Sequence, residues 1–302
     1  MAERTASVTE PPTTGAGPVL VRWTAPDALS NLVAVLELAA DGRMRCNATS
    51  RQPSAATVKL IEDALVAGDF YDAGQQPIAA FAWPLLIQVG GLARLSGTQL
   101  KLSPRGCATL ASPSYEALAA LWARWLVAVS TDEMARIEAV KGQRKPGTLT
   151  AAVTRRAAVA AALARLEPGV WTGVGKLLAI LRAQRPPLVA ARSLRALWRL
   201  YVLDSYYGSL GKAGPRAWDL VEGRYALCVL FEYAATVGLI DVAYTDPRGA
   251  RDDYRALWGA DQLSCLSRYD GLAAVRVNDL GAAVLHDPGA LPGLSLPVPC
   301  RA

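Results

Sequence analysis

Apolar residues recur every three or four positions in several stretches of the chain, a pattern typical of helices packed on a core. The first part contains three such stretches, at 26–40, 55–67 and 84–89. Ser54 can cap the second predicted helix, and Pro84 suits the first turn of the third. Helices are also predicted at 150–166, 175–182 and 218–237.

A further helix is predicted between these two groups, from Tyr115 to Val129. Its apolar residues fall on one face, which favours a helix that joins and packs two structural units. This face contains Tyr115, Leu118, Leu121, Trp122, Trp125 and Leu126.

An internal repeat links the two halves of the chain. In register, Leu100, Leu102, Gly106 and Leu110 match Val275, Val277, Gly281 and Leu285. Each copy predicts a helix end, a glycine, two strands and a glycine that begins another helix. The first copy has a tight turn at 96–98, whereas the second has a long loop at 245–270.

The first copy ends in Leu100-Lys-Leu-Ser-Pro-Arg-Gly106, which resembles the L-x-L-T-x-x-G ending of winged-helix domains, with Ser103 in place of threonine. The second copy, 275–281, departs further from that pattern. The chain thus resembles a tandem winged-helix arrangement, and its first unit is similar to the accessory domain of bacterial helicases of the XPB type. Helicase motor motifs are absent from the sequence.

This resemblance implies a mainly α fold with short β-hairpin wings, of class α+β, in which a helix joins two winged-helix-like units. The expected divisions are a tail at 1–25, unit one at 26–112, a connecting helix and basic linker at 113–149, unit two at 150–287 and a tail at 288–302.

Composition favours a folded cytoplasmic protein. The chain has 302 residues, 52% of them hydrophobic, yet no apolar run is long enough for a membrane helix. The N-terminal residues lack the pattern of a secretory signal. Five cysteines lie apart without a CxxC pair, which predicts free thiols and no zinc site.

Charge is distributed unevenly, although the net charge is only +6. From Lys141 to Arg199 there are twelve basic residues and one acidic residue, Glu167, so this segment carries +11. The remaining twenty basic and twenty-five acidic residues leave the rest of the chain at −5. Such asymmetry indicates a surface that faces a polyanion or an acidic protein.

Catalytic patterns are weak, so no enzyme, cofactor or metal is expected. The single histidine, His286, lies beside the predicted C-terminal tail. Gly175 and Lys176 match part of the phosphate-binding P-loop pattern. The pattern is incomplete, because Val170 replaces its first glycine and Leu177 replaces its serine or threonine. A simple helix start is the preferred interpretation, although Gly175 and Lys176 could receive a phosphate. Acidic residues in the C-terminal half are interpreted as solvated rather than as a metal site.

Arginines provide the favoured binding site. Arg192, Arg195 and Arg199 are spaced for one helical face, opposite a buried side predicted to hold Leu194, Leu197, Trp198 and Tyr201. Such arginines suit contacts with the phosphate backbone. The predicted nucleic-acid-binding residues are Arg155, Arg156, Lys176, Arg182, Arg185, Arg192, Arg195, Arg199, Lys212 and Arg216, with Arg94, Lys101 and Arg105 on the first wing.

Base-specific recognition is not expected. A winged helix usually places its third helix in the major groove. The helix predicted at 218–237 is strongly apolar with Arg224 as its one cation, and the stretch 85–89 has none. The sequence therefore favours a non-catalytic, DNA-associated accessory or architectural protein that binds DNA with little sequence preference. The alternative is a protein–protein interaction subunit of a chromosome-organising SMC-type, DNA-processing or defence complex, which binds its partner through apolar helices.

Overall fold

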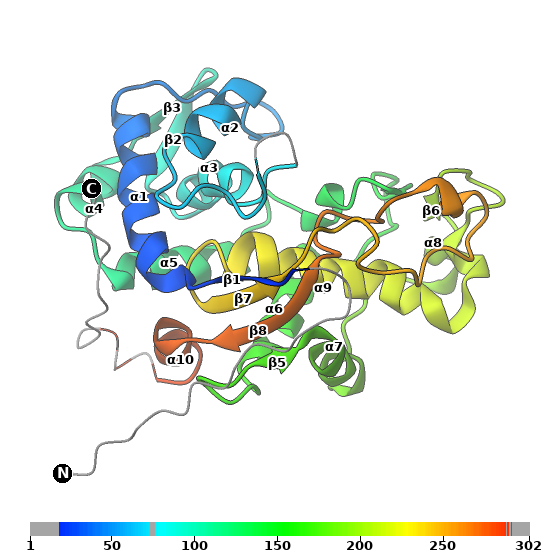
Figure 1. Ribbon diagram of the computed structural model, residues 1–302. Helices are drawn as coiled ribbons and strands as arrows, with labels where there is room; N and C mark the ends of the chain where they lie inside the picture. The colour runs from blue at the N-terminus through cyan, green and yellow to red at the C-terminus, as the bar shows by residue number, and fades with distance from the viewer. Residues whose placement is uncertain (1–17, 73–75, 288, 290, 292–302) are drawn as a thin grey trace, which may run out of the picture. The chain divides into compact units, whose positions relative to one another are not determined.

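Helices dominate the fold, and short strands between them form small sheets, so the class is α+β as predicted. The computed structural model describes residues 18–72, 76–287, 289 and 291 (Figure 1). These residues divide into two units. The N-terminal unit comprises 22–72, 76–130, 232–241 and 277–287, and the basic unit comprises 18–21, 131–231 and 242–276.

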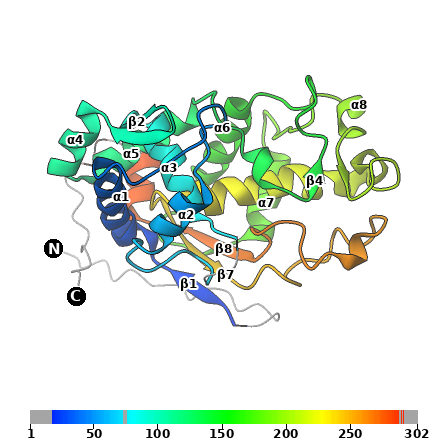
Figure 2. The same cartoon turned by 90° about the horizontal axis from the view of Figure 1, so that it is seen from above.

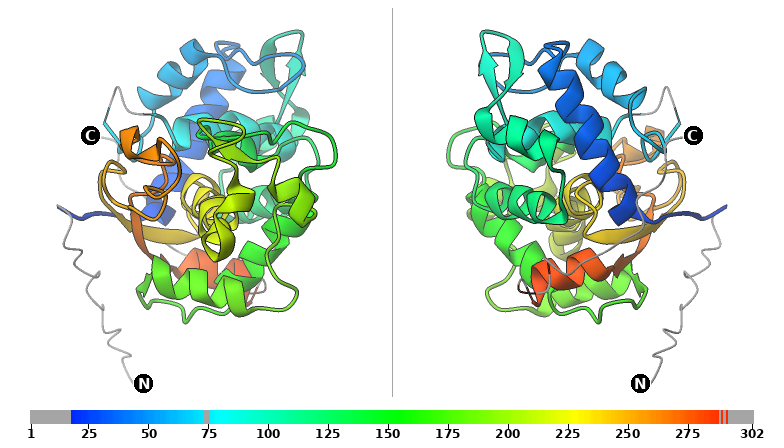
Figure 3. Two further views of the ribbon diagram at one scale, coloured as in Figure 1. Left: turned by 90° about the vertical axis from the view of Figure 1, so that its right-hand side faces the viewer. Right: turned by 90° about the vertical axis from the view of Figure 1, so that its left-hand side faces the viewer.

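Six α-helices and a β-hairpin belong to the described N-terminal unit, where α1 runs as a long helix beside the shorter ones (Figure 3). Its core includes Trp83, Trp122 and Trp125, so the apolar face predicted for 115–129 is buried except at Leu126, where the helix ends. The elements are α1 (Thr24–Ala40), α2 (Ala55–Glu62), α3 (Ala79–Val89), β2 (Ala93–Ser96), β3 (Gln99–Leu102), α4 (Pro104–Ala111), α5 (Tyr115–Leu126) and α10 (Asp279–Leu285).

Helix caps account for two boundaries in this unit. The Ser54 hydroxyl accepts the Thr57 N–H at 3.2 Å, as expected for the cap of α2. Helix α3, however, begins at Ala79, so Pro84 lies inside it and not in its first turn. The reason is Asp69, whose carboxylate accepts N–H groups at the start of α3, including that of Ala79 at 2.9 Å.

The repeat predicted from the sequence has a structural counterpart at its glycines. The Ser103 hydroxyl and the Asn278 amide oxygen each accept a glycine N–H at 3.0 Å, from Gly106 and Gly281 respectively. A Cβ at either glycine would overlap the carbonyl oxygen of a leucine in the same unit. Both positions therefore require glycine, because the chain passes too close for a side chain.

A four-stranded sheet has the order β1-β7-β8-β5 (Figures 1 and 2). Its last pair is antiparallel, with Thr172 opposite Val275. The strand expected at the end of each copy is present, so neither 100–102 nor 275–277 is helical. The strands are β1 (Leu20–Arg22), β5 (Thr172–Gly173), β7 (Ile240–Tyr244) and β8 (Leu272–Val277).

The remaining elements of the basic unit are short apart from α6 and α7. The second small sheet pairs β4 with β6, with Lys141 opposite Tyr201. The helices are η1 (Glu133–Arg136), α6 (Ala152–Leu163), α7 (Val174–Ala183), α8 (Leu194–Leu197), η2 (Leu210–Lys212), η3 (Gly214–Arg216), η4 (Asp219–Gly223), α9 (Arg224–Cys228) and η6 (Ala260–Gln262), and the strands are β4 (Val140–Lys141) and β6 (Tyr201–Val202).

The apolar helix predicted at 218–237 is present as η4, α9 and η5 (Val229–Ala234), with π-helical turns on both sides of α9. Its residues are buried, as expected, including Tyr225 and Phe231. Arg224 is buried as well, and its guanidinium contacts Asp253 at 2.5 Å and Asp270 at 2.9 Å. The only cation of this helix is thus paired with carboxylates of the same unit and does not face solvent.

The second predicted unit, 150–287, is not a single unit in the structure. Residues 232–241 and 277–287 group with the N-terminal unit. Thr24 explains part of this grouping, because its N–H contacts Asp241 at 2.9 Å and its hydroxyl donates to the Ile240 carbonyl at 2.7 Å. Gly238 lies against Ala25 and Ala28 at the start of α1.

Candidate nucleic-acid interface

Arg155 and Arg156 are buried in α6 and do not face a ligand. Arg155 contacts Asp132 at 2.5 Å, and its guanidinium lies over the Tyr225 ring at 4.8 Å. Arg156 contacts Glu133 at 2.6 Å, with both side chains fully buried. Their place in the predicted phosphate-binding set is therefore corrected: they stabilise the basic unit.

The Arg156–Glu133 pair has further hydrogen-bond partners. Arg156 also donates to the Thr131 carbonyl oxygen at 2.7 Å, and the Tyr225 hydroxyl donates to Glu133 at 3.1 Å. Burial raises the pKa of Glu133, and the adjacent Arg156 guanidinium opposes that rise. Sequence spacing missed this pair because Glu133 lies 23 positions earlier, in a segment interpreted as linker.

The helical face predicted for Arg192, Arg195 and Arg199 is also corrected. Helix α8 spans only Leu194–Leu197, and the chain then enters β6, which pairs with β4. Two residues assigned to its buried side are in fact exposed, Leu194 at 69% and Trp198 at 46%.

These three arginines nevertheless remain at or near the surface of the basic unit. The Arg192 Nε donates to the Leu149 carbonyl oxygen at 2.6 Å, and Arg199 donates to that of Pro146 at 3.4 Å. Neither contact neutralises a positive charge. Arg195 has no hydrogen bond or ion pair to the described residues. All three charges are therefore available to an anion.

A second group of cations lies next to this segment. The structure contains a hollow of about 650 Å³ whose lining includes Lys141, Arg144, Lys145 and Tyr201. It is joined to the arginine segment, because Lys141 pairs with Tyr201 across β4 and β6 and Gly142 lies against the Arg199 backbone. These three cations belong to the +11 segment of the sequence but are not among the predicted phosphate-binding residues.

Exposed aromatic rings follow β6. Tyr206 is 67% and Tyr207 56% exposed, and their rings meet edge to face with centroids 5.1 Å apart. The Trp258 ring, 57% exposed, lies 5.3 Å from that of Tyr207. The Lys212 ammonium lies 4.1 Å from the Tyr206 ring centroid. Sequence spacing could not place Trp258 here, because it comes from the long loop.

Together these residues form what we call the aromatic–basic surface. Its parts are connected, because the Trp198 ring lies against Gly211, which precedes Lys212, and Leu203 lies against Gly259, which follows Trp258. Figure 3 shows α8 and the 245–270 segment facing the viewer in its left panel. The surface comprises Lys141, Arg144, Lys145, Arg192, Arg195, Trp198, Arg199, Tyr206, Tyr207, Lys212, Arg216 and Trp258.

The other predicted cations lie elsewhere. Arg182 pairs with Asp219 and stacks on the Trp218 ring, with 4.5 Å between guanidinium and centroid. Lys176 is exposed in the first turn of α7, and Arg185 is exposed just after that helix.

The predicted wing cations belong to the N-terminal unit. Arg94 and Lys101 are opposite each other on the exposed β2–β3 hairpin, and Arg105 is exposed at the start of α4. All three therefore belong to a different unit from the aromatic–basic surface.

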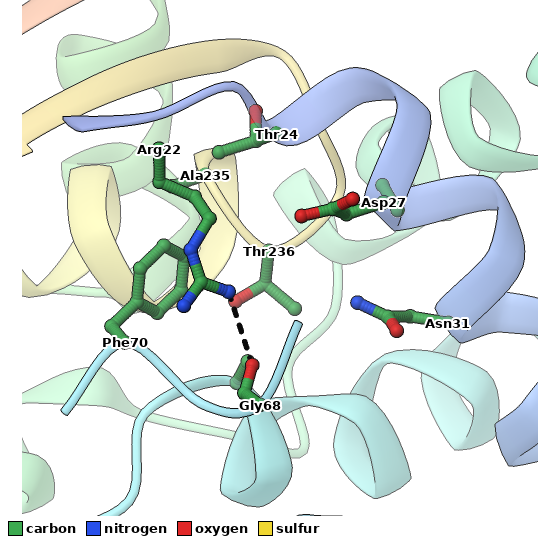
Figure 4. A pocket seen from close by; sticks show the side chains of 10 residues that line it. Arg22, Thr24, Asp27, Asn31, Gly68, Phe70, Ala235 and Thr236 are labelled. Atoms are coloured by element: carbon green, nitrogen blue, oxygen red, sulfur yellow. Dashed lines mark hydrogen bonds between the residues drawn. The ribbon is translucent and has the colours of Figure 1, made fainter. Parts of the chain in front are cut away.

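A small pocket in the N-terminal unit does not provide a ligand site (Figure 4). Its volume is about 20 Å³, enough for about one water molecule. Arg22 lies against it and donates to the carbonyl oxygens of Gly68 at 3.1 Å and Asp69 at 2.9 Å. The Arg22 guanidinium also lies 5.2 Å from the Phe70 ring centroid, so it fastens the 67–70 segment.

Metal-binding residues are not gathered anywhere in the described ranges: no group of three or more His, Cys, Asp or Glu residues could hold an ion. Acidic residues of the C-terminal half are engaged separately, since Asp246 pairs with Arg248 and Asp253 with Arg224. The four described cysteines are free, as expected, whereas Cys300 lies outside the described residues.

Comparison with known proteins gives no relative on which to base an assignment. No family model matches the sequence, and no curated protein or solved structure is significantly similar to it.

No helix in the described part of the chain is long and apolar enough to cross a membrane.

Proposed function

We propose that this protein is a non-catalytic, DNA-associated accessory or architectural protein of the cytoplasm that binds the phosphate backbone through the aromatic–basic surface. The observation that carries this proposal is the group of cations at and beside α8 that have no carboxylate partner. Arg192, Arg195 and Arg199 contact at most backbone carbonyl oxygens. Unpaired surface cations release counterions from DNA on binding and so provide affinity.

Little sequence preference is expected from this surface. Sequence is read by side chains that enter a groove, usually from one exposed helix. Helix α8 has only four residues, and the long helical segment from Asp219 to Ala234 is buried. The cations lie on loops, in the small β4–β6 sheet and in single helical turns such as α8, which suits contacts with phosphates.

The test uses two variants with equal charge change. Arg192→Glu/Arg195→Glu/Arg199→Glu changes the net charge from +6 to 0, and Arg94→Glu/Lys101→Glu/Arg105→Glu does the same. We expect the first variant to lose DNA affinity by at least about tenfold and the second to lose less than about threefold, because contacts at the surface matter beyond net charge. Circular dichroism and thermal unfolding check that both variants are folded.

Equal losses in the two folded variants would contradict the assignment to the aromatic–basic surface. A DNA sequence preferred about a thousandfold over random duplexes would contradict sequence-tolerant binding, since each base-pair mismatch costs roughly 1–3 kcal/mol.

A second candidate, a protein–protein interaction subunit, is favoured by the exposed apolar side chains Leu194, Trp198 and Trp258. Tryptophan, tyrosine and arginine are enriched in protein interfaces. Salt separates the two functions: phosphate binding weakens steeply as ionic strength rises, whereas contact between apolar surfaces does not.

A further inference from the structure

We infer that the rings of Tyr206, Tyr207 and Trp258 form a stacking platform for unpaired bases, so that single-stranded nucleic acid is the preferred ligand of the aromatic–basic surface. This inference rests on the proposed function and specifies its ligand. A duplex hides the faces of its bases in the stack, whereas an unpaired strand can place a base on an exposed ring beside a cation.

The platform is held in shape by its own loop. The Asp204 carboxylate accepts the N–H groups of Tyr206 at 2.8 Å and Tyr207 at 2.7 Å. The Gly208 N–H donates to the Asp204 carbonyl oxygen at 3.0 Å, and a Cβ at Gly208 would overlap the Val202 carbonyl oxygen. These contacts fix a tight turn whose tip carries the two tyrosines.

The backbone conformation of the loop is consistent with a specialised role. Leu203 has φ of +61°, a value that costs energy for a residue with a branched apolar side chain. Its side chain is 48% exposed and lies against Gly259, beside Trp258. A leucine and three aromatic rings exposed together form an apolar cluster of the kind that marks binding sites.

Electrostatics distinguish this platform from a purely apolar patch. The Lys212 ammonium lies over the Tyr206 ring and 5.5 Å from the Tyr207 centroid, and Arg216 is exposed four residues later. Lys141, Arg144 and Lys145 line the neighbouring hollow. A strand whose bases stack on the rings can therefore pass its phosphates along Lys212 and along the cations of the neighbouring hollow.

The experiment compares two double variants of the full chain. Tyr206→Leu/Tyr207→Leu keeps apolar bulk but removes the rings, and Tyr206→Phe/Tyr207→Phe keeps the rings but removes the hydroxyls. Fluorescence anisotropy measures binding to a fluorescein-labelled dT20 strand, a U20 strand and a 20-base-pair duplex at 50 mM salt. We expect the Leu variant to bind both strands at least about tenfold more weakly and the Phe variant to bind within about twofold of the wild type.

Duplex affinity is expected to change by less than about twofold in both double variants, because paired bases are not available to the rings. The platform is supported if the Leu variant loses strand binding and the Phe variant does not. A loss for dT20 only indicates a DNA ligand, and a loss for both dT20 and U20 indicates that either nucleic acid binds. If the Leu variant unfolds at a lower temperature, Trp258→Leu and Trp258→Phe provide the same comparison at the third ring.

Equal binding of dT20 by the Leu and Phe variants, with duplex binding by the wild type retained, would overturn the platform and leave the proposed function intact. Absence of binding to all three probes by the wild type would overturn both and assign the exposed rings to a protein partner.

Discussion

The buried Arg156–Glu133 pair gives a quantitative prediction about stability. Replacing Arg156 with leucine removes the guanidinium that contacts Glu133 at 2.6 Å and the Thr131 carbonyl oxygen at 2.7 Å. Glu133 then remains fully buried without its cation. Breaking a buried pair in this way costs roughly 3–5 kcal/mol, a large part of the roughly 5–15 kcal/mol that stabilises a typical protein.

Urea unfolding followed by circular dichroism measures the effect. With a slope of about 3 kcal/mol per molar urea, the midpoint of Arg156→Leu falls by on the order of 1 M. Arg195→Leu is the matched control, because that arginine is exposed and has no bonded partner in the described ranges. It should change stability by less than about 0.5 kcal/mol.

The double variant Glu133→Leu/Arg156→Leu should recover most of the lost stability, because no charge is then left buried. A single Arg156→Leu variant as stable as Arg195→Leu would refute the assignment of Arg156 as a buried structural residue. That result would indicate that Arg156 is exposed and can bind phosphate, as the sequence predicted.

Three further predictions concern stability and reactivity. Gly106→Ala should destabilise the fold by more than about 1 kcal/mol because its Cβ overlaps a carbonyl oxygen, whereas Gly175→Ala, with open space around its Cβ, should be neutral or slightly stabilising in thermal unfolding. Burial raises the pKa of Asp253, but the hydrogen bond to Arg224 and the charges of Arg224 and Arg251 together lower it more, so the pKa lies below the ordinary value. Urea unfolding should show that Asp253→Asn has a lower free energy of unfolding than the wild type above about pH 5. This difference should disappear as pH falls through the lowered pKa, and a difference that grows in acid contradicts the pairing. Burial raises the pKa of Cys46 to about 11, so alkylation of native protein at pH 8 should modify exposed Cys107 and leave Cys46 unmodified in peptide mass spectra; rapid labelling of Cys46 would contradict its burial.

Local features were predictable from sequence because their causes are local. Ser54 caps α2 through a contact three residues away, and Ser103 and Asn278 each accept the N–H of a glycine three residues later. Helix α5 buries the apolar face that its spacing predicts, except at Leu126. Such features depend on periodicity and caps, which the sequence displays directly.

The candidate site was predictable only in part, because its composition depends on tertiary contacts. Arg155 and Arg156 have the same local signature as exposed arginines, and only distant carboxylates show that they are buried. The spacing of Arg192, Arg195 and Arg199 suggested a long helix, but pairing of β6 with β4 ends it after four residues. The winged-helix resemblance remains a prediction.

The central claim, that the aromatic–basic surface binds nucleic acid through phosphates, is tested most directly by titrating a labelled dT20 strand at salt concentrations from 50 to 200 mM. Four to six neutralised phosphates predict a slope of log affinity against log salt of roughly −3 to −4 on a single strand. Arg192→Glu/Arg195→Glu/Arg199→Glu should make this slope shallower by about 2. A slope near zero in the wild type, or no binding at 50 mM salt, would contradict the account.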